Sequence, residues 1–370
     1  MAAAQSPDME GGDLQYISRL IRLARHFVPA AVFDPTRSGY RSGTLCLLAF
    51  DKFYEKNGSP DRNKTTMYIP NEYAVQIAVE FPDLFVPFGS VNPYRHDAIQ
   101  ELEKCAQLGV TIIKWLPNSM GIDPSDEQCV PFYMKMNELG MALLVHIGEE
   151  HAVNAAYINN RLGNPLLLRR ALDCGVKVIG AHCATEGMSA DLDNGGVTVS
   201  CFSLFLRLMR EDKYKGLLFG DISATCGFKR LPYLKQLLQA TDIHDRLVYG
   251  SDYPVPAINL VVHTSKLLRY SIHHTIFYQA YIVHTVLQPF LTLPLPLLTL
   301  PLSSTRQGFI TQEEASVLNE LYNYNPLLFD FACKRLVRGP SGEKFPPQVF
   351  KAHPLLPPFR HESKLLGSPV

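Results

Sequence analysis

The chain has 370 residues, enough for one large domain or two small ones, and 46% of them are hydrophobic, which is ample material for a globular core. Lysine plus arginine equals aspartate plus glutamate at 35 each, so the net charge is zero and nucleic acid is excluded as an expected partner. Eight scattered cysteines without a CxxC pair favour free thiols in a reducing compartment. The first residues show no secretory signal, so we expect a cytoplasmic protein.

The chain is expected to open with a disordered tail over residues 1–12, followed by an amphipathic helix from Asp13 to about His26. Short apolar runs then recur, each ending in polar or small residues. They are too short and too continuous for half-exposed strands, and they indicate strands of a parallel sheet that is covered on both faces. The predicted strands are Leu45–Phe50, Phe85–Val91, Val110–Ile113, Ala142–Val145, Val176–Ala181, Leu217–Phe219 and Leu247–Tyr249.

Helical segments separate several of these strands. Three of them end at Gly109, Gly140 and Gly175, as helices often do. The alternation of strand and helix predicts an α/β fold with a parallel sheet and right-handed crossovers. The predicted helices are His96–Leu108, Pro131–Leu139, Pro165–Cys174 and Leu231–Ala240.

Polar residues end the later strands at regular intervals. Lys114, His146, His182, Asp221 and Asp252 follow one another at spacings of 31 to 39 residues. A (β/α)8 TIM barrel has roughly 31 residues per unit and keeps its active site at the carboxyl ends of its strands. We therefore predict such a barrel, because an open doubly wound sheet would not readily bring successive strand ends to one point.

The strand count is seven, so one barrel strand is missing or atypical. The missing strand should precede residue 45, where Phe27–Phe33 is the available segment. Pro29 weakens that segment as a central strand, because proline cannot donate to the strand ladder.

His146, His182 and Asp252 are the predicted site. Two imidazoles and a carboxylate suit a divalent metal, with zinc as the first choice and manganese or iron as alternatives. Such a metal lowers the pKa of bound water to about 7, and a neighbouring carboxylate can carry the proton to the leaving group. Taken singly, each histidine reads as a hydrogen-bonded core residue and Asp252 as a helix cap. Their shared spacing favours the functional interpretation.

Other polar or aromatic residues near the strand ends leave two interpretations open. Lys114 is a possible metal ligand or an ion-pair partner at the barrel mouth, for instance with Asp221. Trp115 is a substrate platform or a packing residue. Arg95 binds an acidic substrate or forms a surface ion pair.

Several segments are similar to the amidohydrolase-related proteins, a branch of the amidohydrolase superfamily that includes aminocarboxymuconate semialdehyde decarboxylase and various hydrolases. The segments are GVTIIKWLPNS (109–119), LLVHIGEE (143–150), IGAHCATEG (179–187), LVYGSDYP (247–254) and NPLLFDFA (325–332).

This resemblance implies a metal-dependent hydrolase. His146 would be the fifth-strand metal ligand, His182 the sixth-strand ligand or catalytic group, and Asp252 the eighth-strand acid–base or ligand. Lys114 would fall on the fourth strand, where binuclear relatives carry a carboxylated lysine.

Two features depart from the family pattern. The first family strand carries His-x-His, whereas His26 is the only histidine here before residue 96. We interpret this as truncation at the amino end, which would remove two ligands and one strand, weaken metal binding and expose strand edges. The second is Tyr270–Thr305, a Leu/Pro-rich stretch without charged residues. It is interpreted as an insertion, because its prolines make a spanning helix poor.

The expected organisation is a single barrel domain over residues 13–269 and 306–350, with the insertion at 270–305 and a tail at 351–370. The expected function is hydrolysis of a C–N or C–O bond in a small carbonyl compound by metal-activated water. Decarboxylation on the same scaffold and a catalytically inactive barrel without the His-x-His ligands are the alternatives. A small molecule is the expected substrate, a homodimer is possible, and membrane attachment is not expected.

Overall fold

The computed structural model of the protein describes residues 12–27, 44–151, 153, 157–257, 262, 264–268 and 308–351. The predicted strand at Phe27–Phe33, except for Phe27 itself, lies outside these residues. So do the whole of Tyr270–Thr305 and the tail beyond Lys351. The predictions for these segments therefore stay predictions.

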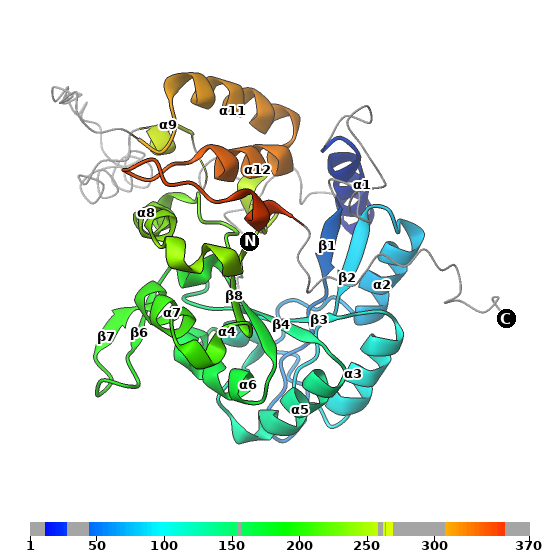
Figure 1. Ribbon diagram of the computed structural model, residues 1–370. Coiled ribbons are helices and arrows are strands. Elements are labelled where there is room, and N and C mark those ends of the chain that lie inside the picture. The colour runs from blue at the N-terminus through cyan, green and yellow to red at the C-terminus, as the bar shows by residue number, and fades with distance from the viewer. Residues whose placement is uncertain are drawn as a thin grey trace, which may run out of the picture.

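Seven parallel strands follow one another in chain order, which confirms the seven strands predicted from the apolar runs. Two form one sheet and five form another, and the bridge from Gly89 to Ile113 joins the sheets. Figure 1 shows the strands gathered at the centre with helices outside them, as in a partial (β/α)8 barrel. The strands are β1 (Leu45–Leu48), β2 (Phe85–Phe88), β3 (Ile112–Trp115), β4 (Ala142–His146), β5 (Lys177–Ala181), β8 (Leu218–Asp221) and β9 (Leu247–Val248).

Helices connect successive strands. The four predicted connecting helices are present, although the third is split into a 3₁₀ turn at Pro165–Leu168 and the helix α6. The connecting helices are α2 (Asn71–Glu80), α3 (Ala98–Gln107), the short α4 (Pro117–Met120), α5 (Val130–Glu138), α6 (Arg169–Asp173), α7 (Cys201–Met209) and α8 (Leu231–Gln239).

The elements that the sequence patterns did not predict lie mainly outside the strand–helix repeat. A hairpin of β6 (Met188–Ala190) and β7 (Thr198–Ser200) follows β5. The helices α9 (Thr264–Leu268), α11 (Gln312–Tyr324) and α12 (Pro326–Leu336) pack together after the last strand (Figure 1). The segment NPLLFDFA at 325–332, one of those that carry the family resemblance, forms the N-cap Asn325 and the first part of α12. No helix in the described part of the chain is long and apolar enough to cross a membrane.

The glycines at the ends of α3 and α5 have the backbone conformation that the sequence predicts. Gly109 has φ of +81° and Gly140 has φ of +66°, in the left-handed region that side chains with a Cβ disfavour. Their amides donate to carbonyls of the preceding helical turn, so each helix ends at a defined residue before the next strand begins.

From β2 to β9 the seven-strand series is largely buried on both faces, whereas every residue of β1 is at least partly exposed. Apolar side chains fill the barrel interior: Val86, Phe88, Ile112, Ala142, Ile179 and Val248. The alternate side chains, such as Ile113, Leu143 and Val178, enter the larger core between the strands and the outer helices. This explains the continuous apolar runs, because each strand needs an apolar residue on both sides.

Helix α1 (Gly12–Arg25) packs against elements that lie near both ends of the strand series. On one side, Leu20 and Ala24 pack with Ile77 and Ala78 of α2. On the other side, the Leu23 carbonyl accepts a hydrogen bond of 2.9 Å from the Asn325 amide, at the corner between α11 and α12. Among the described residues β1 has a partner strand on one side only, and α1 lies at this end of the sheet (Figure 1).

Candidate active site at the carboxyl ends of the strands

His146 and His182 meet at the carboxyl ends of β4 and β5. Their ring centroids are 5.2 Å apart, with the planes inclined by 66°. Both side chains are buried. They are brought together because β4 and β5 pair in parallel register, with His146 opposite Ala181. The sequence prediction that successive strand ends bring these two residues to one point is therefore correct.

Both imidazoles are neutral near pH 7. Burial, followed by the positive charges of Lys114 and Arg230, lowers the pKa of His146 to about 3. Burial also holds the pKa of His182 well below its usual value, with Arg230 as the next cause. A neutral imidazole keeps one nitrogen lone pair, which can accept a proton or bind an electrophile.

The hydrogen bonds of His182 define its tautomer. The Ser223 hydroxyl donates to the Asp221 carboxylate, so its oxygen accepts from Nδ1 of His182 at 2.7 Å. Asp221 also accepts from the backbone amide of His182 at 2.9 Å. The lone pair of His182 is therefore on Nε2. Asp221 orients the histidine, and it does not form an ion pair with Lys114.

Nε2 of His146 lies 3.3 Å from the Glu149 carbonyl oxygen and 3.5 Å from a Glu150 carboxylate oxygen. A carbonyl oxygen can only accept, so Nε2 carries the proton and the lone pair is on Nδ1.

Lys114 is the penultimate residue of β3 and is buried. Burial lowers the pKa of its amine, while the charges of Asp221, Asp252 and Glu150 act in the opposite direction. These effects place Lys114 among the polar groups of the site, as the strand-end spacing predicts, although no ion pair within 4 Å forms with any described carboxylate.

Asp252 lies just beyond β9 on an exposed turn, with φ of +62°. Its charge raises the pKa of both His146 and Lys114, which places it on the same side of the barrel. Left-handed backbone is unusual for residues other than glycine and is concentrated at functional sites. His182 shares this property, with φ of +58°.

A buried ion pair in α12 supports the Asp252 turn. Lys334 is fully buried and donates to Asp330 at 2.6 Å and to the Gly250 carbonyl at 2.8 Å. The hydroxyl of Tyr249 donates to the same Asp330 carboxylate at 2.9 Å. The helix therefore fixes Tyr249 and Gly250, the two residues that directly follow β9 and precede the Asp252 turn.

Two charged or polar groups at the site were missed by the sequence patterns. The Arg230 guanidinium, near the start of α8, lies 3.1 Å from Glu186 and 3.2 Å from the Thr185 hydroxyl, and it lowers the pKa of both histidines. The pKa of Tyr16 on α1 is raised to about 12, by burial and then by the charge of Asp252. Neither residue offered a local signal, because Arg230 lies in the turn before α8 rather than at a strand end, and tertiary packing places Tyr16.

Trp115, a predicted substrate-binding residue, is not at this rim. Its side chain is fully buried against Phe132 and Tyr133, with centroids 5.4 and 5.8 Å away, and its indole N–H donates to the Val91 carbonyl. The residue points outward from β3 into the core, because the neighbouring Lys114 takes the inward direction. The packing interpretation is the one this environment supports.

Arg95, the other predicted substrate-binding residue, is held by carboxylates. Its guanidinium lies 3.1 Å from Asp51, 2.8 Å from Asp97 and 3.7 Å from Glu101. The buried Asp51 follows β1 and also accepts from the Asn92 amide. Arg95 therefore fixes the loops after β1 and β2, and these contacts support its ion-pair interpretation.

The donor types at the rim are those of a divalent metal site, but the ligand set is incomplete. Among the described residues, no group of three His, Cys, Asp or Glu side chains is arranged to hold a metal ion. The hydrogen-bonded Nε2 of His146 is also unavailable in the tautomer described above. His146, His182 and Asp252 thus do not form a metal site by themselves.

The chain matches the sequence model of a known protein family. The sequence model of a family described as amidohydrolase matches residues 56–257, which include His146, His182 and Asp252. No curated protein sequence matches the chain.

Solved structures with similar folds are distant in sequence. An uncharacterised TIM-barrel protein of Bordetella bronchiseptica is 14% identical, with a TM-score of 0.39, over 64% of this chain and 78% of that chain. A proposed 2-pyrone-4,6-dicarboxylic acid hydrolase from Pseudomonas putida is 16% identical, with a TM-score of 0.36, over 65% of this chain and 94% of that chain. A 5-carboxyvanillate decarboxylase of Novosphingobium aromaticivorans, with bound manganese, is 15% identical, with a TM-score of 0.34, over 50% and 59%.

Proposed function

Because the chain belongs to the amidohydrolase family, we propose that it is a hydrolase that cleaves a C–N or C–O bond next to the carbonyl of a small substrate. The observation that carries this proposal is the convergence of neutral His146 and His182 at one barrel rim, on the side where the charge of Asp252 acts. Barrel enzymes place their reacting groups at this end of the strands.

In this proposal Asp252 is the general acid–base. Its carboxylate is exposed at the rim and can accept a proton from the attacking water and return it to the leaving group. His182, oriented by Ser223 and Asp221, presents Nε2 as a second acceptor. The rigid Asp221–Ser223–His182 contacts would keep this nitrogen in place without rearrangement during the reaction.

Two cationic side chains near the histidines, the buried Lys114 and the partly buried Arg230, favour a substrate that carries a carboxylate. The charges of Lys114 and Arg230 both act on the pKa of His146, so an anionic group bound beside the histidines would be attracted by both. This observation also favours the second candidate function, decarboxylation of a small acid, in which the departing group is the carboxylate itself.

The metal of the family stays a proposal for this chain. The family is generally metal-dependent. In this chain His146, His182 and Asp252, with Lys114 as a further ligand, would hold zinc, manganese or iron. Such a site would require donors beyond the described residues. A bound metal would supply water activated at neutral pH. A barrel that has lost catalysis is the remaining alternative, and the incomplete ligand set favours it. A cytoplasmic location and a homodimer also stay predictions.

The activity is tested with the purified full chain on a panel of small carboxylated esters, lactones and amides, with released CO2 measured in parallel on carboxylated aromatic acids. Asp252→Asn should lower kcat by at least about a hundredfold, the usual contribution of a general acid–base group. Asp242→Asn, which changes an exposed carboxylate paired with Arg210, is the matched control. Equal turnover by both variants would contradict the role of Asp252.

Metal content is measured by elemental analysis of the chain and of His146→Ala and His182→Ala. Near-stoichiometric metal that is lost in both variants would support a metal-dependent hydrolase whose ligand set is completed outside the described residues. Metal at background level in a folded chain would contradict metal dependence and leave the acid–base groups or an inactive barrel.

A further inference from the structure

A second cavity lies outside the histidine rim, along one face of α1. One part has a volume of about 270 Å³ and is lined by Gln15, Ser18, Arg19 and Arg22. The adjoining part, of about 610 Å³, shares both arginines and is within the size range of small-molecule sites. Its remaining lining residues are Leu23, His26, Ala257, Tyr322, Asn323, Tyr324, Asn325 and Pro326. We call the two parts together the α1 cleft.

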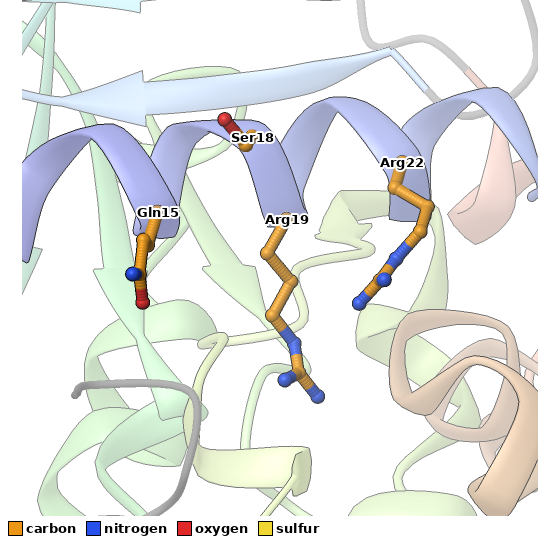
Figure 2. A pocket seen from close by; sticks show the side chains of 4 residues that line it. All are labelled: Gln15, Ser18, Arg19 and Arg22. Carbon is orange, nitrogen blue, oxygen red and sulfur yellow. The ribbon is translucent and has the colours of Figure 1, made fainter. Parts of the chain in front are cut away.

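The cleft is positive. Arg19, Arg22 and His26 follow one another at helical spacing, and no aspartate or glutamate of the described chain lines either part. Figure 2 shows Gln15, Arg19 and Arg22 extending to the same side of α1. Arg22 forms no ion pair with any residue that the structure describes. Three nitrogen-bearing side chains therefore face a common space without a carboxylate on its walls.

The walls of the cleft are fixed by hydrogen bonds. The Asn325 amide donates to the Leu23 carbonyl of α1, and the Tyr322 hydroxyl donates to the Ala257 carbonyl. Asn325 also caps α12 by accepting from the amides of Leu327 and Leu328, so the positive end of that helix dipole lies at the same wall. The apolar side of α1 is packed on α2, which leaves the basic side directed away from that core.

We propose that the α1 cleft binds a small oxyanion ligand, one that carries phosphate or carboxylate groups. Arginine presents a planar fork of N–H donors that matches the two oxygens of such groups, and these charge-assisted bonds are stronger than neutral ones. Arg22 would make the principal contact, since its guanidinium is not engaged by a described carboxylate. The amide and hydroxyl groups of Asn323 and Tyr324 add neutral donors at the opposite wall.

This site is distinct from the hydrolase site proposed above. None of its lining residues is a strand-end histidine, aspartate or lysine. Binding at the cleft therefore does not require that the chain be a hydrolase.

The test is isothermal titration of the full chain with inorganic pyrophosphate and, separately, with citrate, at an ionic strength of about 0.15 M. Arg22→Gln should raise the Kd of the bound anion at least about tenfold, because it removes a charged hydrogen-bonding group. Arg25→Gln removes the same charge from the same helix but lies outside the cleft, and it should leave the Kd within about twofold of the wild-type value. Thermal unfolding of each variant establishes that it is folded.

Tighter binding of pyrophosphate would identify phosphorylated ligands, and tighter binding of citrate would identify polycarboxylates; either supports the site. Asp252→Asn should bind the anion as the wild-type chain does, which separates this result from any failure of the hydrolase proposal. The proposal is overturned if neither anion binds at millimolar concentration, if Arg22→Gln binds normally, or if Arg22→Gln and Arg25→Gln weaken binding equally.

Discussion

At the residue scale, the environment of His146 decides its chemistry. The side chain is buried between its own strand and the residues after it, beside two cations, so the protonated form is disfavoured. The same residue at a solvated strand end would titrate near pH 6.5. Neutrality at physiological pH is what a proton acceptor requires.

This environment makes folding stability depend on pH. In the unfolded chain His146 takes up a proton below about pH 6.5, whereas in the folded protein it does so only near pH 3. Its folded pKa is depressed, so its contribution to stability is lost as the pH falls from about 6.5 toward 3. Between pH 7 and pH 4 the free energy of unfolding should fall by roughly 3 kcal/mol more in the wild-type chain than in His146→Gln. Urea unfolding at both pH values measures the difference, and parallel losses would contradict it.

The Lys334–Asp330 pair gives a second prediction at this scale. Lys334→Met should destabilise the protein by about 3–5 kcal/mol, because it leaves a buried carboxylate without its cation. The double variant Lys334→Met with Asp330→Asn should lose less, since the amide oxygen can still accept from Tyr249 without carrying a charge. Urea unfolding of both variants tests this, and a double variant less stable than the single one would rule out the uncompensated charge as the cause.

At the scale of elements, the glycines after α3 and α5 set where each helix stops. Gly140 has a left-handed backbone with nothing within 4 Å of the position of a Cβ atom, so conformation alone requires glycine there. Gly140→Ala should cost about 1–2 kcal/mol, and Gly140→Asn less, because asparagine adopts this conformation more readily. Thermal unfolding compares the two; equal losses would indicate a steric rather than a conformational cause.

Apolar runs were sufficient to predict the strands of the barrel, because most of these strands are buried on both faces. They were not sufficient for the hairpin of β6 and β7, whose three-residue strands are too short and too exposed to contain an apolar run. Helix α7 had an available signal that the patterns did not use. Ser200 caps it, and Cys201, Phe205 and Leu208 form one of its buried faces.

The candidate site was predictable where it depends on strand ends and unpredictable where it depends on packing across the fold. His146, His182 and Lys114 came from spacing alone, because parallel strands end at one rim. Ser223 and Arg230 lie on loops, and Tyr16 comes from a helix more than 200 residues away in sequence from Asp252, so no local pattern includes them.

At the scale of the whole molecule, the described strands form an arc of seven rather than a closed ring of eight. Strand β1 pairs with β2 on one side only, while β4 and β5 each have two neighbours. Amides of β1 should therefore exchange with solvent through local opening, and orders of magnitude faster than those of β4 and β5, which open only on global unfolding. Hydrogen exchange measures this. Equal protection of β1 would mean that another strand, from this chain or from a second copy, pairs with its free edge.

Helix α1 carries Tyr16 beside Asp252 and, two turns later, Arg22 in the cleft. A ligand that binds only while this helix is docked contributes its binding free energy to the docked state. Binding at two coupled sites is reciprocal. If a ligand in the α1 cleft changes the affinity of the Asp252 rim for its own ligand, then a ligand at the rim must change the affinity of the cleft by the same factor. One short helix would thus link two ligands that never touch.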